Sequence, residues 1–549
     1  MAKSKKVNFI PIYVAVGIVL GILVGNFYAN QYSGKSLSII NATGNKLNDL
    51  LHIIDDQYVD TVDMAQIVEK ALPQILRELD PHSVYISKAD VEASMQDLKG
   101  SFSGIGIQFY PYRDTVCVVQ VIPGGPSEKT GLLAGDRIVR VDGQEYVGEV
   151  VQDNEETKRR LKGETGSVVT LGVLRPGETK ERSFSIVRGD VPVKTVDASY
   201  MLNDTVGYIR ITSFGDTTYP EFLAALAKLN QYDFRNMVID LRGNLGGYMV
   251  PAVQVANEFL TKNRLIVYTK GRKSSREEYA SDGRGAYQTM PLVLLVDEAS
   301  ASASEILAGA IQDNDRGTIV GRRTFGKGLV QVPIEFNDGS MLRLTKARYY
   351  TPSGRCLQKP YVPGADSEYE LDLLNRLEHG ELYSKDSIRY SGEEYKTRIG
   401  RKVYGGGGII PDVFVPRDTM GMTSYFKDAY MNGYLSDFAF DFVDQHRNKL
   451  RNKTSLDDVL SYLKKYDLVE LFVRYANKQG LKRRNLLIRK SEKLLDEYIK
   501  TAIISDVLDV ESTVRFVNES DPCVKSALDL FEKNAAFPSL PADSVPTKE

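Results

Sequence analysis

The stretch Pro291–Val332, PLVLLVDEASASASEILAGAIQDNDRGTIVGRRTFGKGLVQV, decides the fold of this 549-residue chain. The apolar run Leu292–Val296 predicts a buried β-strand, and the apolar side of Glu305–Gln312 predicts a helix after a turn of small residues. This arrangement places Ser302 at a helix N-terminus, where free backbone N–H groups and the helix dipole favour negative charge. Lys327 follows between two glycines in a second short segment.

Ser302 and Lys327 each have an ordinary interpretation. Ser302 and Glu305 fit a capping box, which ties down the first turn of a helix, and an isolated lysine is typical of a solvated surface. A catalytic interpretation pairs the two residues, because a serine hydroxyl is a weak nucleophile that needs a base. Lysine becomes such a base when burial lowers its pKa from ~10.4.

Histidine offers an independent test of this pairing. None of the chain's four histidines lies near the serine segment: His52, His82, His379 and His446. A Ser-His-Asp triad would therefore have to recruit a histidine from a flanking region, whereas the lysine interpretation needs no such recruitment.

Four further motifs accompany this stretch. They are LDPHS at Leu79–Ser83, GLLAGDRIVRVDG at Gly131–Gly143, DLRGNLGG at Asp240–Gly247 and GGGGIIPD at Gly405–Asp412. With ASASEILAGAIQDNDR and GRRTFGKGLVQ, they make roughly residues 40 to 415 similar to the carboxyl-terminal (tail-specific) processing proteases. These are PDZ-containing serine peptidases with a Ser–Lys pair. The resemblance implies an α/β multidomain protein with a ClpP/crotonase-like peptidase core and an inserted PDZ domain, and it implies neither a metal ion nor a nucleotide.

The resemblance also implies roles for individual residues. It makes Ser302 the nucleophile and Lys327 the base, which is oriented by Gln331 in several members and by an aspartate matching Asp313 in others. In a straight strand, Lys327 and Gln331 would stand roughly 13 Å apart, so their contact requires a bend, which Gly328 could supply.

The resemblance implies an oxyanion hole formed by the backbone of Gly246 and the N–H of Ala303. Such donors typically change the rate by ~10²–10³. Gly246 and Gly247 also fit a simple turn at the entry to a helix, and the two interpretations are compatible.

Residues 101–189 form the expected PDZ domain. Gly104, Ile105, Gly106 and Ile107 are its candidate peptide-binding residues, because the glycines leave N–H groups free for a peptide carboxylate and the following strand edge can accept an added strand. Taken alone, this run is typical of the entry to a hairpin. Arg175 matches an arginine that reaches towards the active site in some family members, and its alternative is a solvated strand arginine.

The N-terminus predicts a membrane-targeting segment. Lys3, Lys5 and Lys6 precede a densely apolar stretch, residues 9–24, and about 20 residues suffice to span a bilayer. We expect an uncleaved single-pass anchor in the inner membrane of a bacterial cell envelope, with the bulk of the chain outside the cytoplasm. A cleaved signal peptide, which would release the protein to the periplasm, is the second interpretation, and a buried core helix is the third.

Composition bears on the binding partners and on disulfide bonds. A formal net charge of −2 gives no reason to expect a nucleic-acid partner, and three distant cysteines indicate no disulfide framework. The expected domains are 1–34 (anchor), 35–100 (helical), 101–189 (PDZ), 190–416 (core, with an insertion at about 361–400), 417–537 (helical, for packing or homo-oligomerisation) and 538–549 (disordered).

The predicted function is an extracytoplasmic serine endopeptidase that cuts proteins with apolar C-termini. The alternative is a PDZ adaptor with an inactive peptidase-like core, against which the presence of both Ser302 and Lys327 argues.

Overall fold

The computed structural model describes residues 42–365, 369–390 and 392–539, which divide into two compact units at Leu76 and Arg77. The first unit contains the helices α2 (Ala42–Gln57) and most of α3 (Met64–Arg77), as the apolar periodicity predicts. The expected membrane segment, residues 1–34, lies outside the described residues. Among the described helices, none combines the length and the apolar character needed to cross a bilayer.

The core of the second unit is a six-stranded sheet in the order β10-β11-β12-β15-β16-β21. Its strands are Val196–Met201, Val206–Ile211, Asn236–Asp240, Leu292–Val296, Thr318–Gly321 and Val413–Phe414. Only β10 runs antiparallel to its neighbour within this sheet. All five residues of β15 are buried, as expected for a central parallel strand that is covered on both faces.

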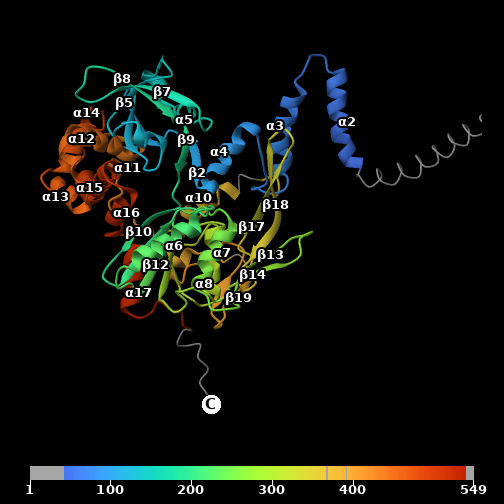
Figure 1. Cartoon of the computed structure of the whole chain (residues 1–549). Coiled ribbons are helices and arrows are strands. Elements are labelled where there is room, and N and C mark those ends of the chain that lie inside the picture. Colours follow the sequence, from blue (N-terminus) through green and yellow to red (C-terminus); the bar gives the residue numbers. More distant parts are fainter. Residues whose placement is uncertain (1–41, 366–368, 391, 540–549) are drawn as a thin grey trace, which may run out of the picture. The chain divides into compact units, whose positions relative to one another are not determined.

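Helices from distant parts of the chain cover the two faces of this sheet. On one face lie α6 (Thr218–Leu229), α7 (Met249–Asn257) and α8 (Ala303–Asp313). On the other face, the last helices, α16 (Val510–Asn518) and α17 (Pro522–Glu532), pack against side chains of β10, β11, β12 and β15 (Figure 1). The C-terminal region therefore completes the core of the peptidase sheet.

A second sheet lies beside the first and carries the lysine segment. It has the order β1-β18-β13-β14, with β17 on β18. Its strands are Val84–Ile86, Met341–Tyr350, Leu265–Lys270, Glu277–Ala280 and Leu329–Glu335. The polar, basic composition of residues 270–288 predicts a loop, which is wrong for β14, because Glu277–Ala280 pairs with the apolar strand β13.

Two further regions add detail to the sequence expectations. The insertion 361–400 contains α10 (Asp372–Glu378) and β19 (Glu394–Lys396), and β19 pairs with β20 (Lys402–Tyr404). The amphipathic pattern over 456–476 predicts one helix, but these residues form α13 (Leu456–Leu463) and α14 (Leu468–Lys478), because Asp467 caps a new helix. The expected disordered tail lies, from residue 540, outside the described residues.

The PDZ region is built on the sheet order β3-β4-β5-β7-β8, with β6 on β5. These strands are Ile107–Tyr112, Thr115–Val121, Arg137–Val141, Val168–Leu174, Arg182–Val187 and Gln144–Glu145. The pair β2 (Ser101–Gly104) and β9 (Gly189–Pro192) connects this sheet to the rest of the unit, and α5 (Asn154–Leu161) completes the region. Because β3 is the edge strand of its sheet, one side of β3 is available for an added strand.

The outer face of the PDZ sheet packs against α12 (Tyr434–Leu450) of the C-terminal helical region, which also contains α11 (Ser424–Met431) and α15 (Asn485–Val507) (Figure 1). Phe440 lies between the rings of Tyr110 and Tyr112, with ring centroids 5.6 and 4.7 Å away.

Acidic residues on the same side of α12 bind the PDZ sheet around Phe440. Asp437 and Asp441 accept hydrogen bonds from the two tyrosine hydroxyls, and Asp444 pairs with Arg137 at 2.9 Å. Their spacing of three and four residues places them on one face of the helix, which therefore fixes the PDZ region through a continuous stripe.

Candidate active site

Ser302 occupies a strained position at the N-terminus of α8. Its φ of 55° and ψ of −113° are uncommon for a residue with a side chain. Residues in such conformations cost of order 1–3 kcal/mol and persist where the surrounding structure holds them, often at functional sites. The strained residue lies in the sharp turn between β15 and α8.

Three serines lie in the turn, and their surroundings distinguish them. Ser300 and Ser304 are fully buried, and their hydroxyls donate to the backbone oxygens of Leu241 and Asn244 at 2.8 and 3.0 Å. Ser302 is only partly buried. Of the three, Ser302 is therefore the one whose hydroxyl is not committed to the backbone of the neighbouring loop.

The buried carboxylate of Glu305 holds the serine and lysine segments together. One of its oxygens accepts the backbone N–H groups of Ser302 (2.9 Å) and Lys327 (2.8 Å). The other accepts the Gly326 N–H at 2.8 Å and the Thr324 hydroxyl at 2.5 Å. Sequence reasoning identified Glu305 only as a helix cap, and nothing in a local pattern reveals its bonds to residues about twenty positions later.

Burial raises the pKa of Glu305 to about 6, while the four donors oppose that rise because they favour the charged form. Tyr349 adds a second connection, since its hydroxyl contacts the backbone oxygens of both Ser302 and Lys327. The two segments are thus joined twice, by a carboxylate that binds their N–H groups and by a hydroxyl that contacts their carbonyl oxygens.

Lys327 is largely buried, and its Nζ donates to the Gln331 Oε1 at 3.1 Å. Lys327 precedes β17 in an irregular segment, and a bulge lies between Val330 and Gln331, so the chain is not straight over these five residues. The contact between Lys327 and Gln331 therefore forms where the chain bends, as expected. The β-bulge contributes to this bend in addition to Gly328. Burial and then the nearby charge of Arg343 lower the pKa of Lys327, against the opposing effect of Glu305 and Asp80.

His82 supports this arrangement without supplying a base. Its backbone oxygen accepts a hydrogen bond from the Gln331 amide, and its Nε2 lies 2.8 Å from the Tyr369 hydroxyl. Burial and the charge of Lys327 lower the pKa of His82 to about 4, so the ring is neutral at neutral pH. Asp80 fixes the segment by accepting the N–H groups of His82 and Ser83, both at 2.9 Å.

Gly246 lies against the serine. A Cβ atom on Gly246 would fall 2.6 Å from the Cβ of Ser302 and 2.7 Å from the backbone oxygen of Ala301, and its φ is +102°. The Gly246 N–H donates to the Asn244 side chain at 2.8 Å. Among the hydrogen bonds of the described residues, the Ala303 N–H has no acceptor. Of the two expected oxyanion donors, the Gly246 N–H is therefore already engaged and the Ala303 N–H is not.

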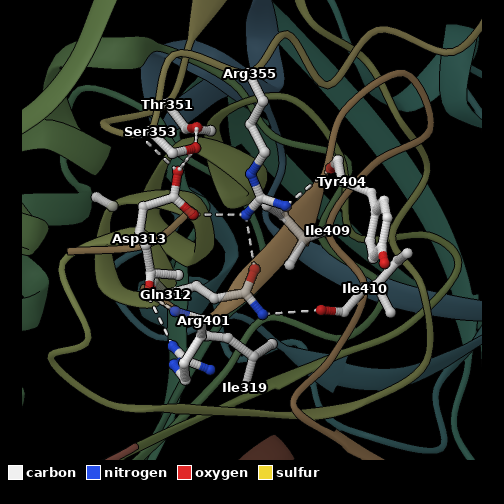
Figure 2. Close-up of polar contacts among 12 residues, drawn as sticks. Gln312, Asp313, Ile319, Thr351, Ser353, Arg355, Arg401, Tyr404, Ile409 and Ile410 are labelled. Atoms are coloured by element: carbon white, nitrogen blue, oxygen red, sulfur yellow. Dashed lines mark hydrogen bonds and ion pairs between the residues drawn. The ribbon is translucent and has the colours of Figure 1, made fainter. Parts of the chain in front are cut away.

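Asp313 lies at the other end of α8, about 16 Å along the helix from Ser302. Figure 2 shows its carboxylate bound to Arg355 at 2.7 Å and to the Ser353 hydroxyl at 2.6 Å. Gln312 extends the same network to the backbone of Ile410 at 2.9 Å. Asp313 thus stabilises the loop that follows β18, and the residue bound to the Lys327 ammonium is Gln331.

The PDZ candidates lie where a peptide carboxylate would meet backbone donors. Gly106 has a φ of +75°, and a Cβ there would approach the Cα of Gly125 to 3.1 Å, so the tight loop requires glycine. Among the described residues, the N–H groups of Ile105 and Gly106 have no acceptor, while their oxygens bind Ser127 and Ile122. Ile107 begins the edge strand β3 directly after this loop.

Arg175 forms a two-pronged ion pair with Asp136, with both N–O distances at 2.7 Å, and its Nη2 also donates to the Gly131 oxygen at 3.0 Å. It lines a cavity of about 510 Å³ together with Arg447 of α12 and Asp506 of α15. In this structure, Arg175 therefore faces the C-terminal helical region.

Comparison with known proteins agrees with this geometry. Residues 205–367 match Peptidase family S41, residues 103–186 match the PDZ domain, and residues 425–509 match a family of unknown function (DUF8443).

Two curated relatives cover most of the chain. The carboxy-terminal processing protease CtpB of Bacillus subtilis is 34% identical over 418 residues, which are 75% of this chain and 82% of the relative. The carboxy-terminal-processing protease of Bartonella bacilliformis is 33% identical over 379 residues, which are 68% and 84%. A solved photosystem II D1 C-terminal processing protease is 26% identical, with 69% and 94% covered and a TM-score of 0.35.

The fold, the PDZ region and the family matches define a PDZ-containing serine-type peptidase. The chain belongs to Peptidase family S41, among the carboxy-terminal processing proteases.

The role of Glu305 is tested by Glu305→Gln. The amide keeps the size but turns an N–H group towards buried donors, and each donor left unpaired costs ~1–3 kcal/mol. We expect kcat for a peptide substrate to fall at least about tenfold and the urea midpoint to decrease. In the wild type, activity should fall as the pH drops through about 6, where Glu305 takes up a proton.

Glu298→Gln is the matched control, since Glu298 pairs with Arg322 at 2.7 Å in the neighbouring turn and bonds to neither Ser302 nor Lys327. Wild-type turnover in Glu305→Gln would contradict the role assigned to this carboxylate.

Proposed function

We propose that this peptidase cleaves extracytoplasmic proteins whose apolar C-terminal tails bind the PDZ region, and that it does so by a Ser302–Lys327 mechanism. The observation that carries the proposal is the Glu305 carboxylate, which binds the backbone of the strained Ser302 and of the buried Lys327 on one oxygen. This contact joins the serine and lysine segments, as does the Tyr349 hydroxyl. The hydroxyls of Ser300 and Ser304 are bound to the backbone of Leu241 and Asn244, which leaves Ser302 as the serine available to react.

In the proposed reaction, neutral Lys327 takes the proton from the Ser302 hydroxyl as its oxygen attacks the peptide carbonyl. The resulting oxyanion accepts the Ala303 N–H and the Gly246 N–H, which it must share with or take from Asn244. Lys327 then gives the proton to the leaving amine. Water, deprotonated by Lys327, attacks the acyl carbon and releases Ser302 with its proton restored. Gln331 holds the lysine in place throughout.

Substrate selection follows from the PDZ loop. The free N–H groups of Ile105 and Gly106 suit a terminal carboxylate, and the edge of β3 suits an extended tail. The alternative, a PDZ adaptor with an inactive core, is not favoured, because the candidate nucleophile, base and orienting residue are all present and the relatives are processing proteases. A homo-oligomer through the C-terminal helices stays a prediction, which sedimentation analysis would test.

The Ser–Lys mechanism predicts that Ser302→Ala and Lys327→Arg are both inactive while their thermal unfolding stays close to wild type. Arginine keeps the charge but cannot act as a base, because its guanidinium stays protonated at any working pH. Because the pKa of Lys327 lies below the ordinary 10.5, wild-type activity should rise with pH through that lowered value as the neutral amine forms.

The measurement is peptide cleavage across pH under conditions where chemistry limits the rate. Turnover by Ser302→Ala would move the nucleophile elsewhere. A pH profile that is flat from the acid to the alkaline side would exclude lysine as the base.

The PDZ region is proposed to gate the peptidase through Arg175. Gating requires that a bound tail favour a state in which Arg175 leaves Asp136, since a tail that binds both states equally shifts nothing. We expect Arg175→Ala to keep tail binding, measured in a Ser302→Ala background, and to lose most cleavage. Ile107→Asp should instead weaken tail binding first. Normal cleavage of full-length substrates by Arg175→Ala would leave the PDZ region as a tether only.

The N-terminal segment is proposed to anchor the protein in the inner membrane, with the peptidase outside the cytoplasm. The supporting pattern is Lys3, Lys5 and Lys6 before the apolar residues 9–24. We expect the protein to stay with membranes during carbonate extraction, and a chain that starts at Ser36 to be soluble and active on peptides. Release by carbonate, or a mature N-terminus near residue 30, would favour the cleaved signal peptide.

A further inference from the structure

The loop Leu241–Gly247, here called the oxyanion loop, is interlocked with the serine turn. The Leu241 oxygen accepts the Ser300 hydroxyl at 2.8 Å, and the Asn244 oxygen accepts the Ala301 N–H and the Ser304 hydroxyl, both at 3.0 Å. Gly246 is packed on Ser302, so the position of this loop sets where the Gly246 N–H lies relative to the nucleophile.

Arg242 fixes the outer end of the oxyanion loop. Its Nε and Nη2 bind the carboxylate of Asp240, with the shortest distance at 2.6 Å, and Asp240 is itself buried and bound to the Tyr208 hydroxyl at 2.7 Å. The remaining nitrogen, Nη1, donates to the Asp521 Oδ2 at 2.7 Å. The guanidinium therefore lies between the carboxylate of Asp240, in β12, and the carboxylate of Asp521, near the C-terminal end of the described residues.

Asp521 is the N-cap of α17, a helix that is packed against the peptidase sheet. Its Oδ1 accepts the N–H groups of Cys523 and Val524 at 2.8 and 3.0 Å, so Oδ2 is left for Arg242. The helix buries Val524, Ala527 and Phe531 against the second face of the peptidase sheet. Asp521 lies beyond the residues matched to Peptidase family S41 and beyond those matched to the helical family.

We propose that Asp521 is a positioning residue for the active site: through Arg242 it holds the oxyanion loop in register with Ser302. A guanidinium bound by two carboxylates has little freedom, because its planar donors fit them in fixed geometry. Displacements of about 1 Å at a reacting centre are enough to reduce the rate strongly. The inference rests on the proposed function, which assigns Gly246 to the oxyanion.

A purely structural role is the competing interpretation, in which Asp521 only caps α17. Asp521→Asn separates the two, because asparagine is an equally good N-cap but brings no charge to Arg242. We expect kcat to fall about tenfold, less than the ~10²–10³ lost with an oxyanion donor, while KM stays unchanged. The labelling rate of Ser302 by a phosphonate, whose adduct places an oxygen in the oxyanion hole, should fall by a similar factor.

Asp509→Asn is the matched control, because Asp509 caps the adjacent helix α16 through the Ser512 N–H at 2.8 Å and bonds to no residue of the oxyanion loop. It should retain wild-type kcat. If Asp521→Asn unfolds, Asp521→Ser offers a second uncharged cap and should show the same loss of kcat.

A wild-type kcat and labelling rate in a folded Asp521→Asn or Asp521→Ser would overturn the inference. An equal loss of kcat in Asp509→Asn would overturn it too, and so would an effect of Asp521→Asn on KM alone. A failure of the proposed function can be told apart from a failure of this inference. In that case cleavage or phosphonate labelling would persist in Ser302→Ala.

Discussion

The buried carboxylate of Glu305 joins the two segments of the proposed active site. Glu305 accepts four hydrogen bonds from the serine and lysine segments and has no exposed surface. A carboxylate in such surroundings is stable only when its oxygens are satisfied, because an unpaired buried charge is far more costly than an unpaired dipole. The strained turn at Ser302 and the irregular segment before β17 supply those donors, so the two segments stabilise each other.

The same carboxylate opposes the proposed chemistry in one respect. A negative charge close to Lys327 favours the ammonium form, whereas a base must be neutral. Burial of the lysine and the positive charge of Arg343 outweigh this effect, since the pKa of Lys327 is lowered overall. The same carboxylate thus joins the two segments and opposes the deprotonation of the proposed base.

The sequence predicted what depends on local pattern and missed what depends on distant contacts. Strand β15 and helix α8 follow from the apolar periodicity within the stretch 291–332, whereas the pairing of Ser302 with Lys327 comes from the family resemblance and stays a prediction. The strand β14 was missed because Glu277–Ala280 is polar and is held by its partner β13. The ion pair between Arg242 and Asp521 joins residues 279 positions apart, and no periodic or local signal links them.

The C-terminal region now has a physical reason to be part of this enzyme. Its helix α12 fixes the PDZ sheet through Phe440 and its acidic stripe, and its helix α17 covers the peptidase sheet and binds Arg242. The PDZ region and the oxyanion loop are therefore connected by packed helices in addition to the direct chain connection through β9. Packed helices transmit displacements because protein interiors are dense and compress little. A tail that moves the PDZ region must then either release α12 or carry the helical region with it, and only the second course changes the position of Asp521.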